Sequence, residues 1–381
     1  MKKLLMFTVA AGLLTVSACS KTTGSGHDGK KTLVVDEVEL DSITINADST
    51  GMYGNFMLMD SSLVFVDITQ CKIFAFSLDN GELLNTYSQR GQGPGDMQGV
   101  MYGTVIEPDG NRMLIVNSSA YVYEFDKSTG EVKPAGRMGI YQDIEDKDNY
   151  ESPECYFAMT GGMDDLGVTT TALDDTTLLV PVVLNNRNLT ELSADRYEKG
   201  HILAHFDPRT MRVRELKGSF PQWYKDNPMP AFEFFDYAVE PETGVIYVSH
   251  GPDSLIYRYD RDYNLIGRFG LEPQGTDRSY TRGFEKEPYV AFREDIKHVG
   301  ANTGLYYDPT DRILFRTTMT DFPTGRTILQ GYRGDDMIME QEMPAYFKML
   351  GRYGDRYYGV RFKPAEDEDN LYFNLYSFRL K

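Results

Sequence analysis

Residues 63–87, LVFVDITQCKIFAFSLDNGELLNTY, hold three short runs rich in aliphatic and aromatic side chains, separated by two turns. The runs cover residues 63–67, 71–76 and 83–87. The second turn contains Asn80-Gly81, which is a strong hairpin signal because both residues tolerate a positive φ. The stretch therefore predicts three short strands that follow one another in an antiparallel meander.

The same succession of strands and turns recurs along the chain. Six units begin near Tyr53, Met101, Thr169, Phe234, Ala301 and Tyr346. In three of them an aromatic residue ends the third strand and an aspartate opens the next turn: Phe125-Asp126, Phe206-Asp207 and Tyr259-Asp260. The aromatic ring can fill the space between stacked sheets, and the aspartate can accept hydrogen bonds from the turn backbone. Six short sheets without a long amphipathic helix predict an all-β, six-bladed β-propeller over residues 32–381.

The last unit ends with the chain, one strand short. Residues 32–40 (TLVVDEVEL) are strand-like and precede the first unit. We predict that this N-terminal strand closes the last blade, because closure removes a free sheet edge. A pair of β-sandwiches is the alternative architecture, since strand spacing alone does not separate the two.

The first residues of the chain predict export. Lys2 and Lys3 precede an apolar run, and Ser17-Ala18 precede Cys19, as in a secretory signal. A cysteine at the cleavage position resembles a bacterial lipoprotein signal, which implies that residues 1–18 are removed and Cys19 is lipidated. The alternative is an ordinary signal peptide that ends near a cysteine. Residues 19–31 are small and polar, and we predict a flexible tether.

The chain is strongly acidic. Its formal charge is −18, and loss of Lys2 and Lys3 with the signal makes it −20. Such a surface repels phosphate, so we predict no nucleic-acid partner and a membrane contact through the lipid anchor alone. Cys71 and Cys155 are the other cysteines. An exported compartment permits a disulfide between them, although a buried free thiol at Cys71 is the favoured interpretation.

The segment 87–96, YSQRGQGPGD, contains the most distinctive motif. It resembles the Arg-Gly-x-Gly-Pro-Gly-Glu loop of six-bladed propeller lipoproteins of Bacteroidota, which are related to TolB-like and NHL-like propellers. Asp96 stands where that family usually has Glu. The resemblance implies a fold and an envelope location but little chemistry. Gly93-Pro94-Gly95 is a turn, and Arg90 and Asp96 flank it and could pair across its base. The favoured interpretation is a loop that merely connects two blades. The alternative is a binding loop, with Arg90 and Asp96 as the predicted ligand-binding residues.

Three segments interrupt the repeat: residues 142–153, 222–230 and 274–288, which we expect to be loops over one face of the propeller. Calcium is the favoured metal, since acidic residues crowd two segments, Glu145 to Glu151 and Glu366 to Asp369. Neither has an EF-hand pattern, and we predict no resident metal or cofactor. His201, His205 and Asp207 could share one side of a strand, but Asp207 reads as a turn residue.

The sequence contains no signature of a nucleophilic enzyme. It lacks a Gly-x-Ser-x-Gly elbow, and Ser249-His250-Gly251 reads as a strand end. We therefore predict no catalytic residue. The favoured function is a non-catalytic lipoprotein that binds a glycan, a peptide or an envelope protein. It would be anchored to the outer membrane. The resemblance to Bacteroidota lipoproteins implies that it faces the periplasm, because an acidic run after the cysteine resembles their surface-export signal and no such run follows Cys19. The alternative is a propeller lyase or hydrolase acting on glycans or peptides.

Overall fold

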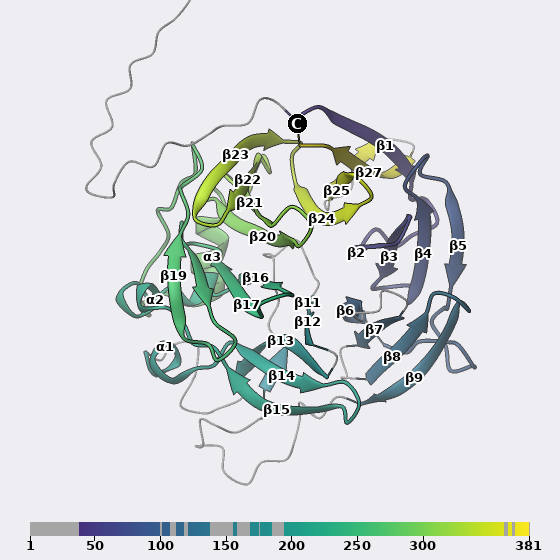
Figure 1. The fold of residues 1–381 in the computed structure, drawn as a ribbon, viewed down its shortest axis with the longest axis horizontal. Helices are drawn as coiled ribbons and strands as arrows, with labels where there is room; N and C mark the ends of the chain where they lie inside the picture. Colours follow the sequence, from purple (N-terminus) through teal and green to yellow (C-terminus); the bar gives the residue numbers. More distant parts are fainter. Residues whose placement is uncertain are drawn as a thin grey trace, which may run out of the picture. The chain divides into compact units, whose positions relative to one another are not determined.

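A computed structural model of the chain describes residues 38–99, 101–106, 112–117, 121–137, 155–157, 168–174, 176–184, 194–361, 365–367 and 370–380. The chain divides into two units between Lys31 and Thr32. All described residues belong to the second unit, so the predicted signal, Cys19 and the tether lie outside them. Within this unit, six antiparallel sheets surround a common centre and form a six-bladed β-propeller, as predicted (Figure 1).

The first three blades follow the chain from their innermost strand outward. Blade 1 consists of β2 (Gly54–Met59), β3 (Ser62–Asp67), β4 (Lys72–Ser77) and β5 (Leu83–Tyr87). Blade 2 consists of β6 (Met101–Ile106), β7 (Arg112–Asn117), β8 (Tyr121–Asp126) and β9 (Glu131–Arg137), with β11 (Val168–Thr169) parallel to β6. Blade 3 consists of β12 (Thr171–Asp174), β13 (Thr177–Leu184), β14 (Leu203–Asp207) and β15 (Arg212–Lys217), with β10 (Cys155–Phe157) beside β13.

The other three blades repeat this arrangement, and the six predicted starting points agree with the first strands to within two residues. Blade 4 consists of β16 (Phe235–Glu240), β17 (Val245–His250), β18 (Ile256–Tyr259) and β19 (Leu265–Phe269). Blade 5 consists of β20 (Ala301–Asp308), β21 (Ile313–Met319), β22 (Thr327–Arg333) and β23 (Asp336–Met343). Blade 6 contains β24 (Phe347–Tyr353), β25 (Arg356–Arg361) and β27 (Asn370–Phe378), with β26 (Ala365–Asp367) on β27.

An N-terminal strand closes the last blade, as predicted, but it is a different segment. Strand β1 (Leu40–Asn46) pairs with β27 along its whole length, from Leu40 opposite Phe378 to Asn46 opposite Tyr372. The predicted strand, residues 32–40, shares only Leu40 with it, and residues 32–37 lie outside the described part of the chain. The physical reason for the correction is that Ile43 and Ile45, two positions apart, lie on one strand face and pack into the core between blades 6 and 1.

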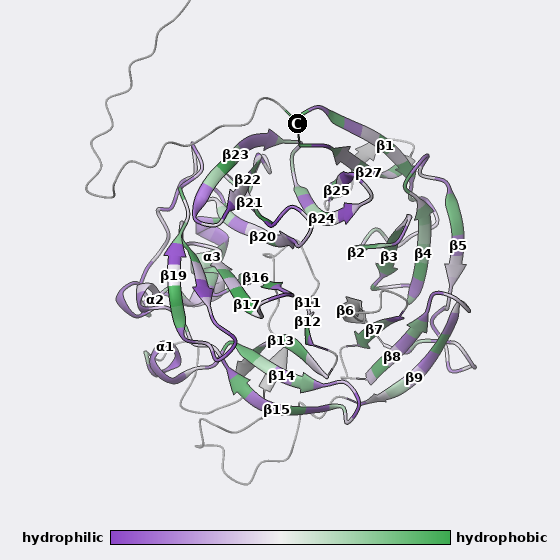
Figure 2. Cartoon of the chain, in the orientation of Figure 1, coloured by the Kyte–Doolittle hydropathy of each residue, from purple (hydrophilic) through white to green (hydrophobic). Residues whose placement is uncertain are grey.

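The hydrophobic core lies between the blades. In the described residues it forms six clusters, each shared by two neighbouring blades. Phe125 of blade 2 packs with Val64 and Val66 of blade 1, and Phe206 of blade 3 packs with Leu114 of blade 2. Figure 2 shows hydrophobic residues recurring along the strands of the blades. The predicted role of the aromatic residue at the end of the third strand is confirmed.

The aspartates that follow these aromatic residues organise the turns. Asp126 accepts a hydrogen bond from Ser128 N at 2.8 Å, Asp207 from Arg209 N at 2.9 Å and Asp260 from Asn264 N at 2.8 Å. A carboxylate that satisfies turn amides stabilises the chain reversal. The hairpin predicted at Asn80-Gly81 also forms, with Gly81 at a φ of 75°.

Two of the three predicted loops contain short helices and pack on one another. The connection between β15 and β16 contains α2 (Gln222–Asp226) and η1 (Pro230–Phe232), and the connection between β19 and β20 contains α3 (Pro288–Asp295). A further short helix, α1 (Asp195–Lys199), lies between β13 and β14. Gly283 N donates to Pro228 O at 2.7 Å, and the Phe232 and Phe292 rings stack at 5.1 Å. Both segments lead from an outermost strand to the next innermost strand, so they leave the antiparallel sheets at the same face. Residues 142–153 lie outside the described residues.

Closure of the ring by β1 generates the first prediction. Ile45 is fully buried between blades 6 and 1, so Ile45→Ala should lower the free energy of unfolding by about 2–5 kcal/mol. The matched control is Thr44→Ala on the exposed face of the same strand, which should change it by about 0.5 kcal/mol or less. Urea denaturation of both variants measures the difference, and equal losses would contradict this role of β1.

Candidate functional site

The innermost strands of the propeller surround a central cavity of about 950 Å³. Its lining comes from β2, β12, β16, β20 and β24, which belong to five of the six blades and converge at the centre in Figure 1. Ligand pockets of proteins have volumes of about 300–1,000 Å³. The cavity therefore has the volume of a small-ligand site, and side chains of five blades can contact a ligand there.

Asp236 is the acidic group of this cavity. It is the second residue of β16, lies opposite Ser249 of β17, and is only 7% exposed. Among the described residues, no hydrogen-bond partner reaches its Oδ2 atom. Burial disfavours the charged form of the carboxyl group and raises its pKa to about 7. A buried acceptor without a partner is energetically costly, which makes it a candidate contact for a ligand.

Asn55 supplies a donor on the opposite part of the ring. It lies in β2 opposite Val66, is 7% exposed, and its Nδ2 atom has no partner among the described residues. The residue before it must be small, because a Cβ on Gly54 would lie 2.2 Å from Val66 O. The close approach of β2 and β3 thus places the Asn55 amide at the cavity wall.

Lys348 is the basic group of the cavity and comes from a third blade. It lies in β24 opposite Val360, and burial lowers the pKa of its ammonium group to about 8. No ion pair within 4.0 Å joins Lys348 to Asp236, both of which the structure describes. The cavity therefore presents separate acidic and basic groups from blades 4 and 6.

The remaining lining is partly apolar and partly fixed by local bonds. Phe56, Tyr306 and Leu350 are partly exposed and border the cavity. Arg261 and Asp174, also in the lining, form an ion pair with one another. Because that pair is already satisfied, Asp236 and Asn55 are the better candidates for direct ligand contact.

The predicted Arg90–Asp96 pair does not form. Arg90 Nη2 instead donates to Gly99 O at 3.2 Å, and Asp96 Oδ2 accepts from Gly93 N at 2.8 Å. The base of the loop is closed by main-chain bonds, since Met97 N donates to Gln89 O at 2.9 Å. The carboxylate is nearer to the amides of its own turn than to the guanidinium, which explains the error.

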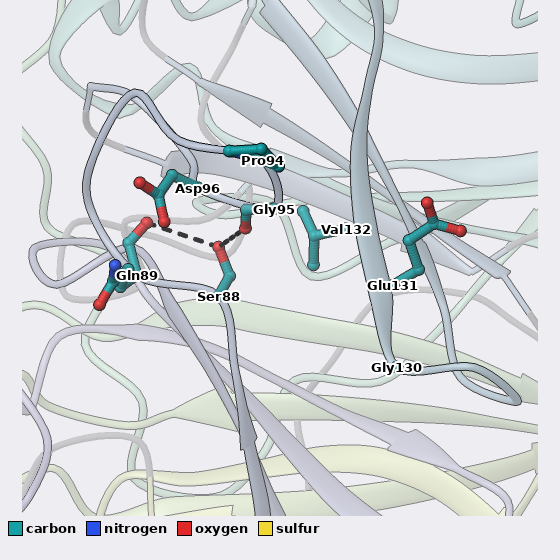
Figure 3. Close-up of a pocket in the computed structure, with 8 residues that line it drawn as sticks. All are labelled: Ser88, Gln89, Pro94, Gly95, Asp96, Gly130, Glu131 and Val132. Carbon is teal, nitrogen blue, oxygen red and sulfur yellow. Dashed lines mark hydrogen bonds between the residues drawn. The ribbon is translucent and has the colours of Figure 1, made fainter.

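The loop borders a second, smaller pocket of about 470 Å³ (Figure 3). Asp96 lines it together with Pro94, with Gly130 of the turn before β9 and with Glu131 and Val132 of β9. Ser88 Oγ donates to Gly95 O at 2.8 Å and holds the two sides of the loop together. Arg90 is not among the lining residues of this pocket. The structure therefore brings only one of the two predicted binding residues, Asp96, to the wall of this pocket.

The other residues singled out in the sequence have structural roles. Cys71 is a free, buried thiol, as predicted, and donates to Gly99 O at 2.9 Å. His205 Nδ1 lies 2.9 Å from Glu215 Oε1, and His201 Nδ1 lies 3.1 Å from Gly218 O, so each ring has its own neighbour. Asp207 accepts a hydrogen bond from Arg209 N in its turn and forms an ion pair with Arg214. In the part of the chain that the structure describes, no three potential metal ligands cluster.

Ser249 and His250 do end a strand, as predicted. They are successive residues of β17 and therefore point to opposite faces of the sheet. The His250 ring is fully buried among aromatic rings, including Tyr224 at 5.1 Å, and burial lowers its pKa to about 3. A serine and a histidine on opposite faces cannot act together as nucleophile and base.

Comparison with known proteins supports the fold. No family model and no curated protein matches the chain. Among solved structures, it is similar to a DUF4221 family member from Bacteroides vulgatus ATCC 8482, with 13% identity over 91% of this chain and 99% of that chain and a TM-score of 0.64. It is also similar to a protein from Bacteroides fragilis NCTC 9343 that its name describes as exported, with 12% identity over 92% and 98% of the chains and a TM-score of 0.51.

The buried carboxyl group predicts a specific pH dependence. Because the pKa of Asp236 is about 7 in the folded protein and 3.8 ordinarily, its neutral form favours folding in acid, and this stability is lost as the pH rises through 7. The Asp236→Asn variant has no carboxyl group at this position, so its free energy of unfolding should not fall in this way as the pH rises. Its free energy of unfolding relative to wild type should therefore rise by roughly 3–4 kcal/mol between about pH 4 and pH 8.

Urea denaturation across this pH range measures the effect. The control is Asp262→Asn in the exposed turn before β19, whose difference from wild type should stay constant with pH. Parallel profiles for wild type and Asp236→Asn would show that Asp236 ionises normally.

Proposed function

We propose that this chain is a non-catalytic envelope lipoprotein whose propeller binds a small ligand in its central cavity. The observation that carries the proposal is the pair of buried, unpartnered polar atoms, Asp236 Oδ2 and Asn55 Nδ2, on the wall of one cavity. A bound ligand would satisfy both atoms and recover the free energy that their burial costs. The structural frame of the propeller would keep them in place.

The envelope location rests on the sequence and on the kind of protein that shares the fold. Cys19 would carry the lipid and anchor the chain to the outer membrane, with the propeller in the periplasm. One similar structure is named as an exported protein. No helix in the described residues is both long and apolar enough to cross a membrane.

The proposal also places the chain among the six-bladed propeller lipoproteins of Bacteroidota, and the loop motif supports this. Residues 90–95, with Asp96 in place of Glu, resemble the loop of the Bacteroidota propeller lipoproteins, and the TolB-like or NHL-like relationship rests on the same blade pattern. Arg90 and Asp96 would serve a second contact surface, for an envelope protein or for a glycan or peptide. The acidic residues 366–369 would be the ligands of a calcium ion, if the chain binds one.

A propeller lyase or hydrolase is the second candidate, favoured by one observation. A carboxyl group with a pKa near 7 suits a general acid or base, and Asp236 has this property. Catalysis also needs a second group that acts on the same bond, and no histidine is among the described lining residues. Cleavage of peptide or glycan probes by wild type and not by Asp236→Asn would establish this candidate over the binding function.

The lipid anchor is tested through its attachment residue. Cys19→Ser should abolish incorporation of radiolabelled palmitate and move the protein from the membrane fraction to the soluble fraction. Cys71→Ser is the control, because a buried thiol inside the propeller should not affect labelling. Labelling and membrane retention of the Cys19→Ser protein would contradict the anchor.

Ligand binding is tested by closing the cavity. Gly304 of β20 lines it, and a Cβ at this position would meet only Thr317, at 3.4 Å or more, so a larger side chain can be introduced. A ligand at about 100 times its Kd stabilises the folded protein by about 2.7 kcal/mol. We expect peptide or glycan probes to raise the Tm of wild type and to lose this effect in Gly304→Leu.

The control for this variant is Thr86→Leu on the exposed outer strand β5, which should respond like wild type. A shift that persists in Gly304→Leu would place the ligand elsewhere. Crosslinked co-purification from the envelope tests the protein-partner alternative separately, since a stoichiometric partner would be captured irrespective of the cavity.

A further inference from the structure

We propose that the ligand of the central cavity is a neutral sugar of one or two rings, which forms hydrogen bonds with Asp236 and Asn55 through its hydroxyl groups. This inference rests on the proposed binding function and names the ligand class of the same site. It depends on three features of the cavity: the hydrogen-bonding capacity of its two unpartnered side chains, the balance of charge in its lining, and the aromatic rings at its wall.

The first feature is that one unpartnered atom is an acceptor and the other is a donor. Asp236 Oδ2 and Asn55 Nδ2 are buried, and neither has a hydrogen-bond partner among the described residues. Both side chains line the cavity, Asp236 from β16 of blade 4 and Asn55 from β2 of blade 1. A hydroxyl group both donates and accepts hydrogen bonds. A molecule with several hydroxyl groups can therefore satisfy both side chains with groups of a single kind.

A hydroxyl group also suits Asp236 in both of its protonation states. Burial raises the pKa of this carboxyl group to about 7, so its neutral and charged forms are both populated near neutral pH. The carboxylate accepts a hydrogen bond from a hydroxyl group, and the protonated acid donates one to it. An ammonium group only donates and a carbonyl group only accepts, so each of them matches one form alone.

The second feature is that the charges of the described lining balance. Its charged residues are two acidic and two basic ones, Asp174, Asp236, Arg261 and Lys348. Arg261 forms an ion pair with Asp174, and Lys348 has an interaction partner of its own within the chain. No excess of one sign therefore selects a charged ligand. The formal charge of −18 over the whole chain further disfavours an anionic ligand such as a sugar phosphate.

The third feature is a pair of aromatic rings at the cavity wall. Phe56 of β2 and Tyr306 of β20 are partly exposed and line the cavity. The Phe56 ring packs against the ring of Phe65, with the two centroids 4.6 Å apart. The Tyr306 ring stacks on that of Phe315 at 6.4 Å, so core contacts hold both rings in place. A sugar has C–H groups on its ring faces and hydroxyl groups at its edge, so it can pack on these rings while its edge forms hydrogen bonds.

The volume of the cavity limits the length of the ligand. About 950 Å³ lies at the upper end of the range for pockets that take small molecules. Such a pocket has room for one or two sugar rings and not for a long glycan. A short peptide also carries donors and acceptors along its backbone, so the experiment includes it as the alternative ligand.

The experiment is isothermal titration of the purified full chain with neutral sugars. The detergent is of the polyoxyethylene type, because a detergent with a sugar headgroup would compete for the cavity. The sugars are glucose, galactose, mannose, N-acetylglucosamine, maltose, cellobiose and lactose, and the alternatives are Ala-Ala-Ala and the diamine putrescine. We expect at least one neutral sugar to bind. Its fully O-methylated form should bind at least about tenfold more weakly, because methylation removes the hydroxyl donors.

Matched variants assign the hydrogen bonds. Asp236→Leu and Asn55→Leu remove the polar groups and should each weaken sugar binding about tenfold. At pH 6, where the Asp236 carboxyl group is mainly neutral, Asp236→Asn should stay within about threefold of wild type, because an amide also donates to and accepts from hydroxyl groups. The exposed substitutions Asp262→Leu and Asn85→Leu are the controls and should bind like wild type. Circular dichroism of every variant excludes loss of the fold as the cause.

The outcomes separate this inference from the function on which it rests. Binding of Ala-Ala-Ala or putrescine without binding of any neutral sugar would overturn it. Equal affinity for a sugar and its O-methylated form would do the same, as would sugar binding that Asp236→Leu and Asn55→Leu leave unchanged. In each of these cases a response that Gly304→Leu abolishes would preserve the proposed cavity function. If no probe binds, the inference fails, and the proposed function fails with it.

Discussion

The fold depends on one constraint: each four-stranded sheet has two apolar faces, and only neighbouring sheets can cover both. The six core clusters answer this constraint, since each is shared by two adjacent blades. A row of blades would leave two faces exposed, so the ring must close. Closure falls to the pairing of β1 with β27, which joins residues more than 300 positions apart and makes blade 6 from both ends of the domain. Contacts between residues so distant in sequence form late because loop closure opposes them entropically.

The cavity is a consequence of the same arrangement. Six sheets that pack face to face direct their first strands towards one centre, where residues of five of these strands line the cavity. Polar side chains at these positions do not disrupt the inter-blade cores. Asp236 shows the separation well: Phe235 and Tyr237 on either side of it enter the core shared with blade 3, while its own side chain faces the cavity. Alternation along β16 thus places Phe235 and Tyr237 in the core shared with blade 3 and Asp236 on the other face, at the cavity.

The blades could be predicted because adjacent residues specify their turns. The site could not be predicted because its residues lie far apart in the sequence. Asn80-Gly81 and the aspartates after Phe125 and Phe206 report their turns directly, because a turn is specified by adjacent residues. The closing strand was misplaced because the apolar run of residues 32–40 outweighed the alternation of Ile43 and Ile45. The polar residues Asn55, Asp236 and Lys348 of the cavity come from three blades, and no spacing rule connects them. A charged residue inside an apolar strand, as in Phe235-Asp236-Tyr237, was the one available signal, and it marks a buried charge without naming its partner.

The two unpartnered polar atoms of the cavity lie in blades that are supported in different ways. Between blades 4 and 5, the buried Arg316 donates to Ser254 O and to Gln330, which ties the blade that carries Asp236 to its neighbour. Asn55, by contrast, lies in blade 1, which shares a core with Ile45 of the closing strand β1. A ligand that contacts both Asp236 and Asn55 would therefore link blade 4 to the part of the ring where closure takes place. Because only the closed ring presents both residues together, such a ligand would stabilise ring closure by mass action. The free energy that the burial of these unpartnered atoms costs would be the source of this coupling, since the ligand-bound ring would no longer carry it.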